Sequence, residues 1–107
     1  MSDALLILGL AKKAGKLVVG TPLVCKALAA KTPPALVVVS ARASDNTKKR
    51  LRDKTAHYGV RLFEYDADGE EIALAAGKTS VCASAAICDA GLAGLFLTKA
   101  ENEIHKK

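Results

Sequence analysis

The hydrophobic positions of the chain fall into short runs, separated by stretches in which apolar residues recur at helical spacing. Four of the runs predict strands, and two of these, ALVVVS and VCASAAIC, are apolar enough to be buried on both faces of a sheet. The predicted strands cover residues 16–19, 35–40, 60–65 and 81–88. Strands that alternate with helices predict an α/β fold built in layers, although periodicity does not give the order of the strands.

The intervening segments predict helices with recognisable starts and stops. Asp3 precedes the first and Gly15 follows it, while Pro33 and Pro34 stop the second. Ser44 can cap the third helix, and Asp89 can cap the last. The predicted helices cover residues 4–13, 21–31, 44–57, 70–76 and a final segment from 89 onward.

The third predicted helix is mostly polar, which predicts that only a narrow stripe of it packs inward. The stripe consists of Thr47, Leu51, Thr55 and Tyr58. The cations expected to face solvent are Lys48, Lys49 and Arg52.

The charge is divided unevenly between the two halves of the chain. Up to Arg61 there are 12 lysines and arginines against three aspartates, a net +9, whereas the rest carries a net −4, which gives the overall +5. A basic half of this size is typical of a nucleic-acid-binding protein. A solvated charged surface without a ligand has the same composition.

The length and the remaining composition indicate one domain, residues 1–107, which we expect to be cytoplasmic. The three cysteines are odd in number and lack CxxC spacing, so we interpret Cys25, Cys82 and Cys88 as small core residues rather than disulfide or zinc ligands. No apolar run approaches the roughly 18–20 residues of a membrane span. We therefore expect no metal, no cofactor and no membrane contact.

Catalytic and phosphate-binding motifs find little support. GKT at 77–79 resembles the end of a P-loop, but its earlier glycine is absent and the order is helix, loop, strand. The acidic run 64–69 lacks the glutamate that closes a calcium loop. The serines and cysteines have no obvious histidine base, since His57 lies at a helix end and His105 in the tail. We therefore predict a protein without enzymatic activity or a small-molecule substrate.

The segment GKLVVGTPLVCK, residues 15–26, is the strongest candidate site. Thr21 is a typical N-cap residue and Pro22 suits the first helical position, so a helix should start here, with its N–H groups and positive dipole end beside Lys16 and Lys26. This arrangement suits a phosphate backbone. An ordinary strand–turn–helix junction, with Leu23 packed in the core or on a partner, explains the same residues.

The segments 9–28, 36–49, 57–60 and 73–91 resemble the ribosomal-protein superfamily whose archaeal large-subunit member binds kink-turn RNA. Within it they are similar to the bacterial YlxQ-type branch. The resemblance covers almost the whole chain, and it implies an α-β-α sandwich of three layers around a small mixed sheet. It also implies that RNA is held at the start of the second helix and at the loop 77–81.

The kink-turn binders carry Gly-x-Asn-Glu-x-x-Lys at the first of these places. Here Gly20 and Lys26 match, but Pro22 and Leu23 replace the Asn and Glu whose side chains read sheared G·A pairs. Lysines and a helix start bind phosphates, whereas reading bases requires donors and acceptors at their edges. The predicted RNA-binding residues are Lys13, Lys16, Gly20, Thr21, Pro22, Leu23, Lys26, Lys31, Lys78, Thr79 and Ser80.

Two functions therefore remain. The first is a non-catalytic protein that binds structured RNA, with ribosomal RNA and ribosomal or other proteins as candidate partners. The second is a protein-interaction module on the same fold that has lost kink-turn binding and exposes Pro22 and Leu23 as an apolar patch. The first function predicts that one contiguous basic face is formed by Lys12, Lys13, Lys16, Lys26 and Lys31.

Overall fold

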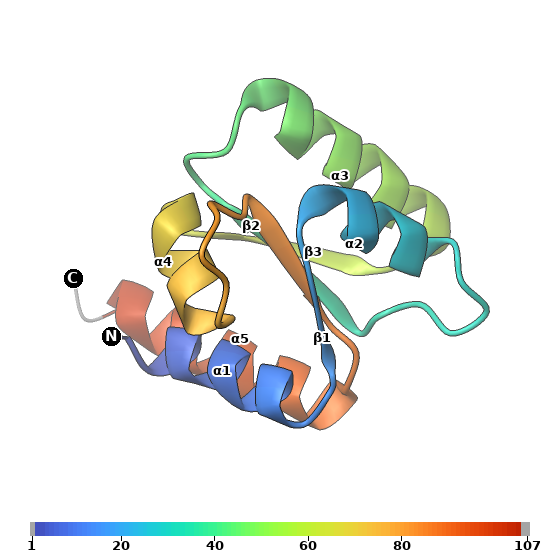
Figure 1. Cartoon of the computed structure of the whole chain (residues 1–107). Coiled ribbons are helices and arrows are strands. Elements are labelled where there is room, and N and C mark those ends of the chain that lie inside the picture. Colours follow the sequence, from blue (N-terminus) through green and yellow to red (C-terminus); the bar gives the residue numbers. More distant parts are fainter. Residues whose placement is uncertain (1, 106–107) are drawn as a thin grey trace.

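The computed structural model describes residues 2–105, with side chains as far as residue 103. Helices and strands alternate along most of it, as the hydrophobic pattern predicts (Figure 1). The elements are α1 (Asp3–Lys13), β1 (Leu17–Val19), α2 (Thr21–Leu28), β2 (Leu36–Ser40), α3 (Asp45–Tyr58), β3 (Arg61–Tyr65), α4 (Gly69–Ala75), β4 (Ser84–Ile87) and α5 (Ala90–His105).

The four strands form one mixed sheet in the order β1-β4-β2-β3. β4 pairs antiparallel with both β1 and β2, and β2 pairs parallel with β3. β2 is buried over its whole length, which confirms the strand with two covered faces. The helix-to-strand alternation was readable from the sequence, whereas this order depends on long-range pairing.

Two apolar clusters, one on each face of the sheet, hold the three layers together. Val37 and Val39 pack with residues of α2 and α3, while Leu36 and Val38 pack with residues of α1, α4 and α5. Alternate side chains of β2 therefore point into opposite clusters, as the period of a strand requires. Figure 1 shows α2 and α3 on one side of the sheet and the other three helices on the opposite side. The predicted α-β-α sandwich is confirmed.

Several finer predictions are wrong. β4 begins at Ser84 rather than at 81, and Cys88 lies exposed after its end. Of the three cysteines, only Cys25 is buried. Tyr58 is exposed at the end of α3. The Lys48 side chain is only 18% exposed, and its ammonium lies 3.8 Å from a carboxylate oxygen of Glu64.

The tyrosine at the end of β3 ties both ends of the described chain to the sheet. The Tyr65 hydroxyl lies 2.6 Å from Ser2 Oγ and donates to Glu103 Oε2 over 2.6 Å. The other oxygen of Glu103 accepts from the Ala4 N–H. Burial, followed by the hydrogen bond to Glu103, raises the pKa of Tyr65. The hydroxyl therefore keeps its proton and remains a donor.

Candidate nucleic-acid interface

The start of α2 is built around Gly20 rather than Thr21. Gly20 has φ 97° and ψ 138°, a backbone conformation that favours glycine, and its carbonyl accepts the first helical bond from the Val24 N–H at 2.9 Å. Its own N–H donates to the Ser84 carbonyl of β4. The predicted Thr21 N-cap is therefore wrong. The Thr21 hydroxyl instead lies 2.9 Å from Ser84 Oγ and fastens the helix start to the sheet.

Within the part of the chain that the structure describes, α2 alone starts without a side-chain cap and without an acidic residue in its first turn. Each of the other helices has a side chain that accepts a hydrogen bond from a first-turn N–H. These acceptors are Ser2 for α1, Ser44 for α3, Asp68 for α4 and Asp89 for α5. Because Pro22 has no N–H, Thr21 and Leu23 supply the uncapped donors, at the positive end of the helix dipole.

A groove of about 460 Å³ lies between β1 and α2. Three exposed lysines from separate parts of the chain line it: Lys12 at the end of α1, Lys26 in α2 and Lys78 in the loop after α4. The floor and the remaining wall are Leu17, Val18, Val19, Leu23, Ala27 and Ala30. None of these lining residues is acidic, so the groove has the charge of an anion site.

The loop from Gly77 to Val81 is the second predicted contact, and Lys78 brings it to the groove. Gly77, with φ 72°, follows the end of α4, and the Lys78 N–H donates to the Ala73 carbonyl at 2.8 Å. Lys78, Thr79 and Ser80 are exposed and line an adjoining hollow of about 500 Å³. The two predicted contact regions, more than fifty positions apart in the sequence, are thus neighbours in space.

Three of the predicted lysines are not in this groove. Lys13 lines a separate hollow between α1 and α4. Lys16 lies at the far end of β1 from Gly20, where its carbonyl accepts from the Cys88 N–H. Although Cys88 is exposed at the surface, desolvation by the neighbouring protein atoms raises the pKa of its thiol, and the Lys16 charge opposes that rise. Lys31 is exposed beyond the groove-lining Ala30. Of the five lysines expected on one basic face, only Lys12 and Lys26 line the groove, where Lys78 joins them.

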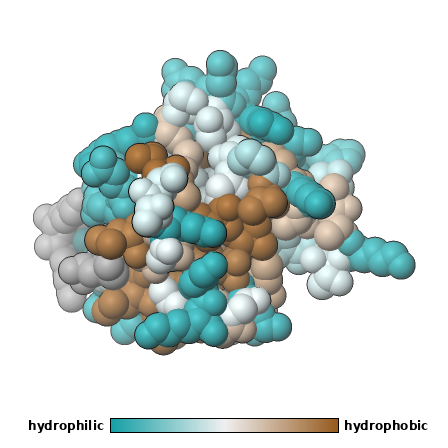
Figure 2. All heavy atoms as spheres, viewed as in Figure 1, coloured by the Kyte–Doolittle hydropathy of each residue, from teal (hydrophilic) through white to brown (hydrophobic). Residues whose placement is uncertain are grey.

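Apolar side chains are exposed beside these lysines. Leu23 is 56% exposed at the start of α2, so it does not pack in the core of the described chain. Leu74 and Val81 are exposed around the adjoining hollow. Figure 2 shows hydrophobic surface across the middle of this face, interrupted by hydrophilic side chains. A ligand here meets both positive charge and apolar area.

The sequence is matched over residues 4–96 by the model of the ribosomal protein L7Ae/L30e/S12e/Gadd45 family. The chain belongs to this family. It is 37% identical over 67 residues to the RNA-binding protein YlxQ of Enterococcus faecium, a match that covers 63% of this chain and 64% of that protein. The aligned part thus spans less than two thirds of this relative's length.

Solved structures show the same fold. A protein of unknown function from Bacillus halodurans superposes with a TM-score of 0.84 and 28% identity, over 94% of this chain and 99% of that one. The 15.5kD RNA binding protein of Giardia lamblia superposes with a TM-score of 0.74 and 16% identity, over 92% and 84%. Neither the family nor the RNA-binding protein of Enterococcus faecium is described as an enzyme, in agreement with the predicted lack of catalysis.

Two further observations bear on other kinds of site. Within residues 2–105, no helix is both long and apolar enough to cross a bilayer. The described side chains include no group of three or more His, Cys, Asp or Glu placed to hold a metal ion.

Proposed function

We propose that the protein binds structured RNA, without catalysing a reaction, through the groove between β1 and α2 and the loop after α4. The observation that carries the proposal is the meeting of Lys12, Lys26 and Lys78 around one groove beside the uncapped start of α2. Membership of a ribosomal-protein family and similarity to an RNA-binding protein support it. We also propose that residues 1–107 form a single RNA-binding domain. As expected from the composition, we propose that it acts in the cytoplasm.

The binding mode follows from which groups are present. Three ammonium groups and the N–H groups of Thr21 and Leu23 contact phosphates, which provides affinity without information about base sequence. The exposed side chains of Pro22 and Leu23 provide apolar contact to sugars or bases but no hydrogen bond. We therefore propose that the RNA is selected by its shape. Ribosomal RNA is the candidate that the family name favours.

The test measures RNA binding against salt concentration for two matched triple variants. Replacing Lys12, Lys26 and Lys78 with glutamine removes the groove charges, while replacing Lys49, Arg50 and Lys54 with glutamine removes the same charge from α3. Each lost phosphate contact lowers the slope of log K against log salt by about 0.7–0.9, so the groove variant should lose about 2–3. Lys26→Ala alone should lose about one contact, equally for all RNA sequences.

Fluorescence anisotropy with a labelled kink-turn RNA and a labelled straight duplex measures the affinity for each RNA and its dependence on salt concentration. The α3 variant should retain the slope of the unaltered protein. Equal losses in the two triple variants would mean that binding follows net charge rather than the groove. If the unaltered protein bound neither RNA with a salt-dependent affinity, the protein-interaction alternative would replace this proposal.

A further inference from the structure

α1 exposes a stripe of four residues that the RNA-binding groove does not use. Asp3, Leu6, Leu10 and Lys13 are all exposed, and their spacing of three, four and three places them along one face of the helix. Leu6 and Leu10 are each 51% exposed. The buried face of the same helix is formed by Ala4, Leu5, Ile7, Leu8 and Ala11. α1 thus carries an apolar seam on its outer side in addition to the one that packs on the core.

The outer seam is widened by α4. Leu6, Leu10 and Lys13 line a hollow of about 410 Å³ together with Leu74, which is 69% exposed. A side chain at Gly9 would lie only 3.3 Å from the Ala75 carbonyl, so glycine allows the two helices to approach closely. The exposed leucines of both helices therefore form one surface.

The order of residues in the stripe is self-complementary. Asp3 and Lys13 lie at equal distances from position 8, and so do Leu6 and Leu10. If a second α1 lies antiparallel across a two-fold axis near position 8, each Leu6 meets the partner's Leu10 and each Asp3 meets the partner's Lys13. Such an isologous contact is the usual form of a homodimer interface.

The charges at the two ends of the stripe can pair with each other only between two molecules. Ten residues of helix span about 15 Å, so Asp3 and Lys13 of one chain cannot reach each other. Neither residue has an ion-pair partner among the described side chains, those of residues 2–103. We propose that the α1 stripe, with Leu74 beside it, is the contact surface for a second copy of this chain.

The dimer should be weak and reversible. Stable interfaces bury about 1,200–2,000 Å² in total, and two helix stripes flanked by one leucine each provide less. We therefore expect dissociation in the micromolar to millimolar range. The groove between β1 and α2 shares no lining residue with the α1–α4 hollow, so we expect it to remain open in both copies of the dimer. Leu74 also lines the hollow beside Lys78, Thr79 and Ser80, so that hollow borders the dimer contact. Two RNA sites on one particle would bind a double-stemmed RNA with avidity.

Sedimentation equilibrium of the full chain, from about 10 μM to about 1 mM, measures the association directly, with about 1.4 kcal/mol for each tenfold change. The unaltered protein should pass from monomer towards dimer mass. Leu6→Gln with Leu10→Gln should weaken association at least tenfold. The matched control is Leu95→Gln, because Leu95 is a 42% exposed leucine on α5 outside the stripe, and it should leave the association unchanged.

A charge exchange tests the antiparallel register. Asp3→Lys places like positive charges opposite each other at both ends, and Lys13→Asp places like negative charges there, so each variant alone should dimerise more weakly. Mixed in equal amounts, they should form a heterodimer at least tenfold tighter than either homodimer, because both end contacts become opposite in charge. Thermal melts of each variant establish that α1 remains folded.

Three outcomes would overturn the proposal. One is a monomer at every concentration, and another is a mixture of the charge variants that associates no better than its components. The third is a leucine variant that dimerises normally but loses RNA affinity, which would assign the stripe to RNA.

Discussion

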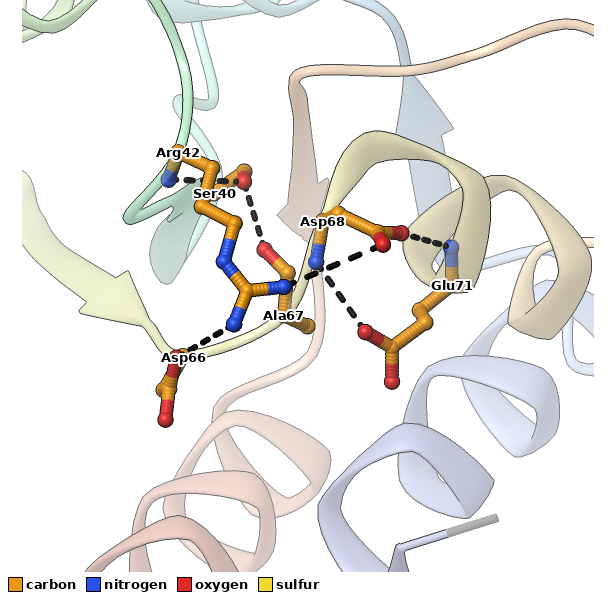
Figure 3. A network of polar contacts seen from close by, with 6 residues as sticks. All are labelled: Ser40, Arg42, Asp66, Ala67, Asp68 and Glu71. Atoms are coloured by element: carbon orange, nitrogen blue, oxygen red, sulfur yellow. Dashed lines mark hydrogen bonds and ion pairs between the residues drawn. The ribbon is translucent and has the colours of Figure 1, made fainter.

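Two helix starts in this molecule have opposite chemistry. At α4, Asp68 Oδ1 accepts from the Glu71 N–H at 2.9 Å, and Glu71 Oε1 accepts in return from the Asp68 N–H at 3.2 Å (Figure 3). Arg42 lies within 3.6 Å of Asp66 and 3.8 Å of Asp68. At α2, a glycine occupies the cap position, and Leu23 of the first turn lines the same groove as the three lysines.

The difference shows how the chain itself decides where an anion can bind. The α4 start is occupied by carboxylates of its own sequence, which satisfy its N–H groups and would repel a phosphate. The α2 start keeps the same kind of N–H donors uncapped and lies beside lysines from three separate segments. Both helix starts carry the positive end of a helix dipole. The cap residues and their neighbours therefore determine which of the two starts is open to an anion.

The largest expected effect comes from Gly20→Ala, which removes the backbone freedom that opens α2. At φ 97° a side chain is strained, at a cost of about 1–3 kcal/mol, although no atom blocks the added methyl group. At about 4–8 °C per kcal/mol, the melting temperature should fall by several degrees or more. Thermal unfolding followed by circular dichroism measures this.

The matched control for this change is Gly94→Ala. Gly94 lies within α5, also with open space around it and with an ordinary φ, so alanine there should stabilise by about 0.5–1 kcal/mol. Equal shifts in melting temperature for the two variants would show that the start of α2 does not depend on the backbone conformation of Gly20.

A second change makes the α2 start resemble both α4 and the kink-turn motif. Pro22→Asn with Leu23→Glu should increase the preference for kink-turn RNA over a straight duplex by about tenfold or more, since hydrogen bonds to a charged group are worth roughly 1.5–3 kcal/mol. The added carboxylate also repels the phosphates of the duplex. Parallel binding isotherms measure the ratio, with a thermal melt to verify folding. A folded variant without the preference would favour the protein-interaction alternative.

The smallest effect is expected at the capped start of α4. Asp68→Ala removes the α4 cap and should cost about 0.5–2 kcal/mol of unfolding free energy. The exposed contact to Arg42 adds little to this. Asp53→Ala, an exposed mid-helix change on α3, should stay within about 0.5 kcal/mol. Urea unfolding distinguishes the two, and RNA affinity should be unchanged in both. A loss of RNA affinity in Asp68→Ala would contradict the assignment of RNA binding to the start of α2 rather than to the start of α4.

Most of the fold could be predicted because the signals were local. The β-branched run at β2 and the capping residues Ser44 and Asp89 act within a few positions of their own sequence. Errors occurred where a distant partner decided the outcome. The Thr21 hydroxyl bonds to Ser84 rather than capping α2. The residues before Ser84 were expected in a strand, but the Cys82 N–H donates to the Gly69 carbonyl instead.

The candidate site was only partly predictable, because a list of lysines does not say which face each one occupies. Lys12 and Lys13 are adjacent, yet a helix turns by about 100° per residue, so one reaches the groove and the other the outer stripe. The end of α2 was placed at Lys31, but the helix ends at Leu28 and leaves Lys31 beyond the groove. The role of Lys78 beside Leu23 depended on the sheet order, which no local pattern contains.

The hydroxyl of Tyr65 has a consequence for how the molecule comes apart. By binding Ser2 and Glu103 at once, it closes nearly the whole chain into a non-covalent ring. A terminal turn of a helix ordinarily frays by itself, but here the first turn of α1 and the last turns of α5 share one anchor. The two ends therefore open together in a single local unfolding event, and hydrogen exchange of the amides near both should give one common opening free energy.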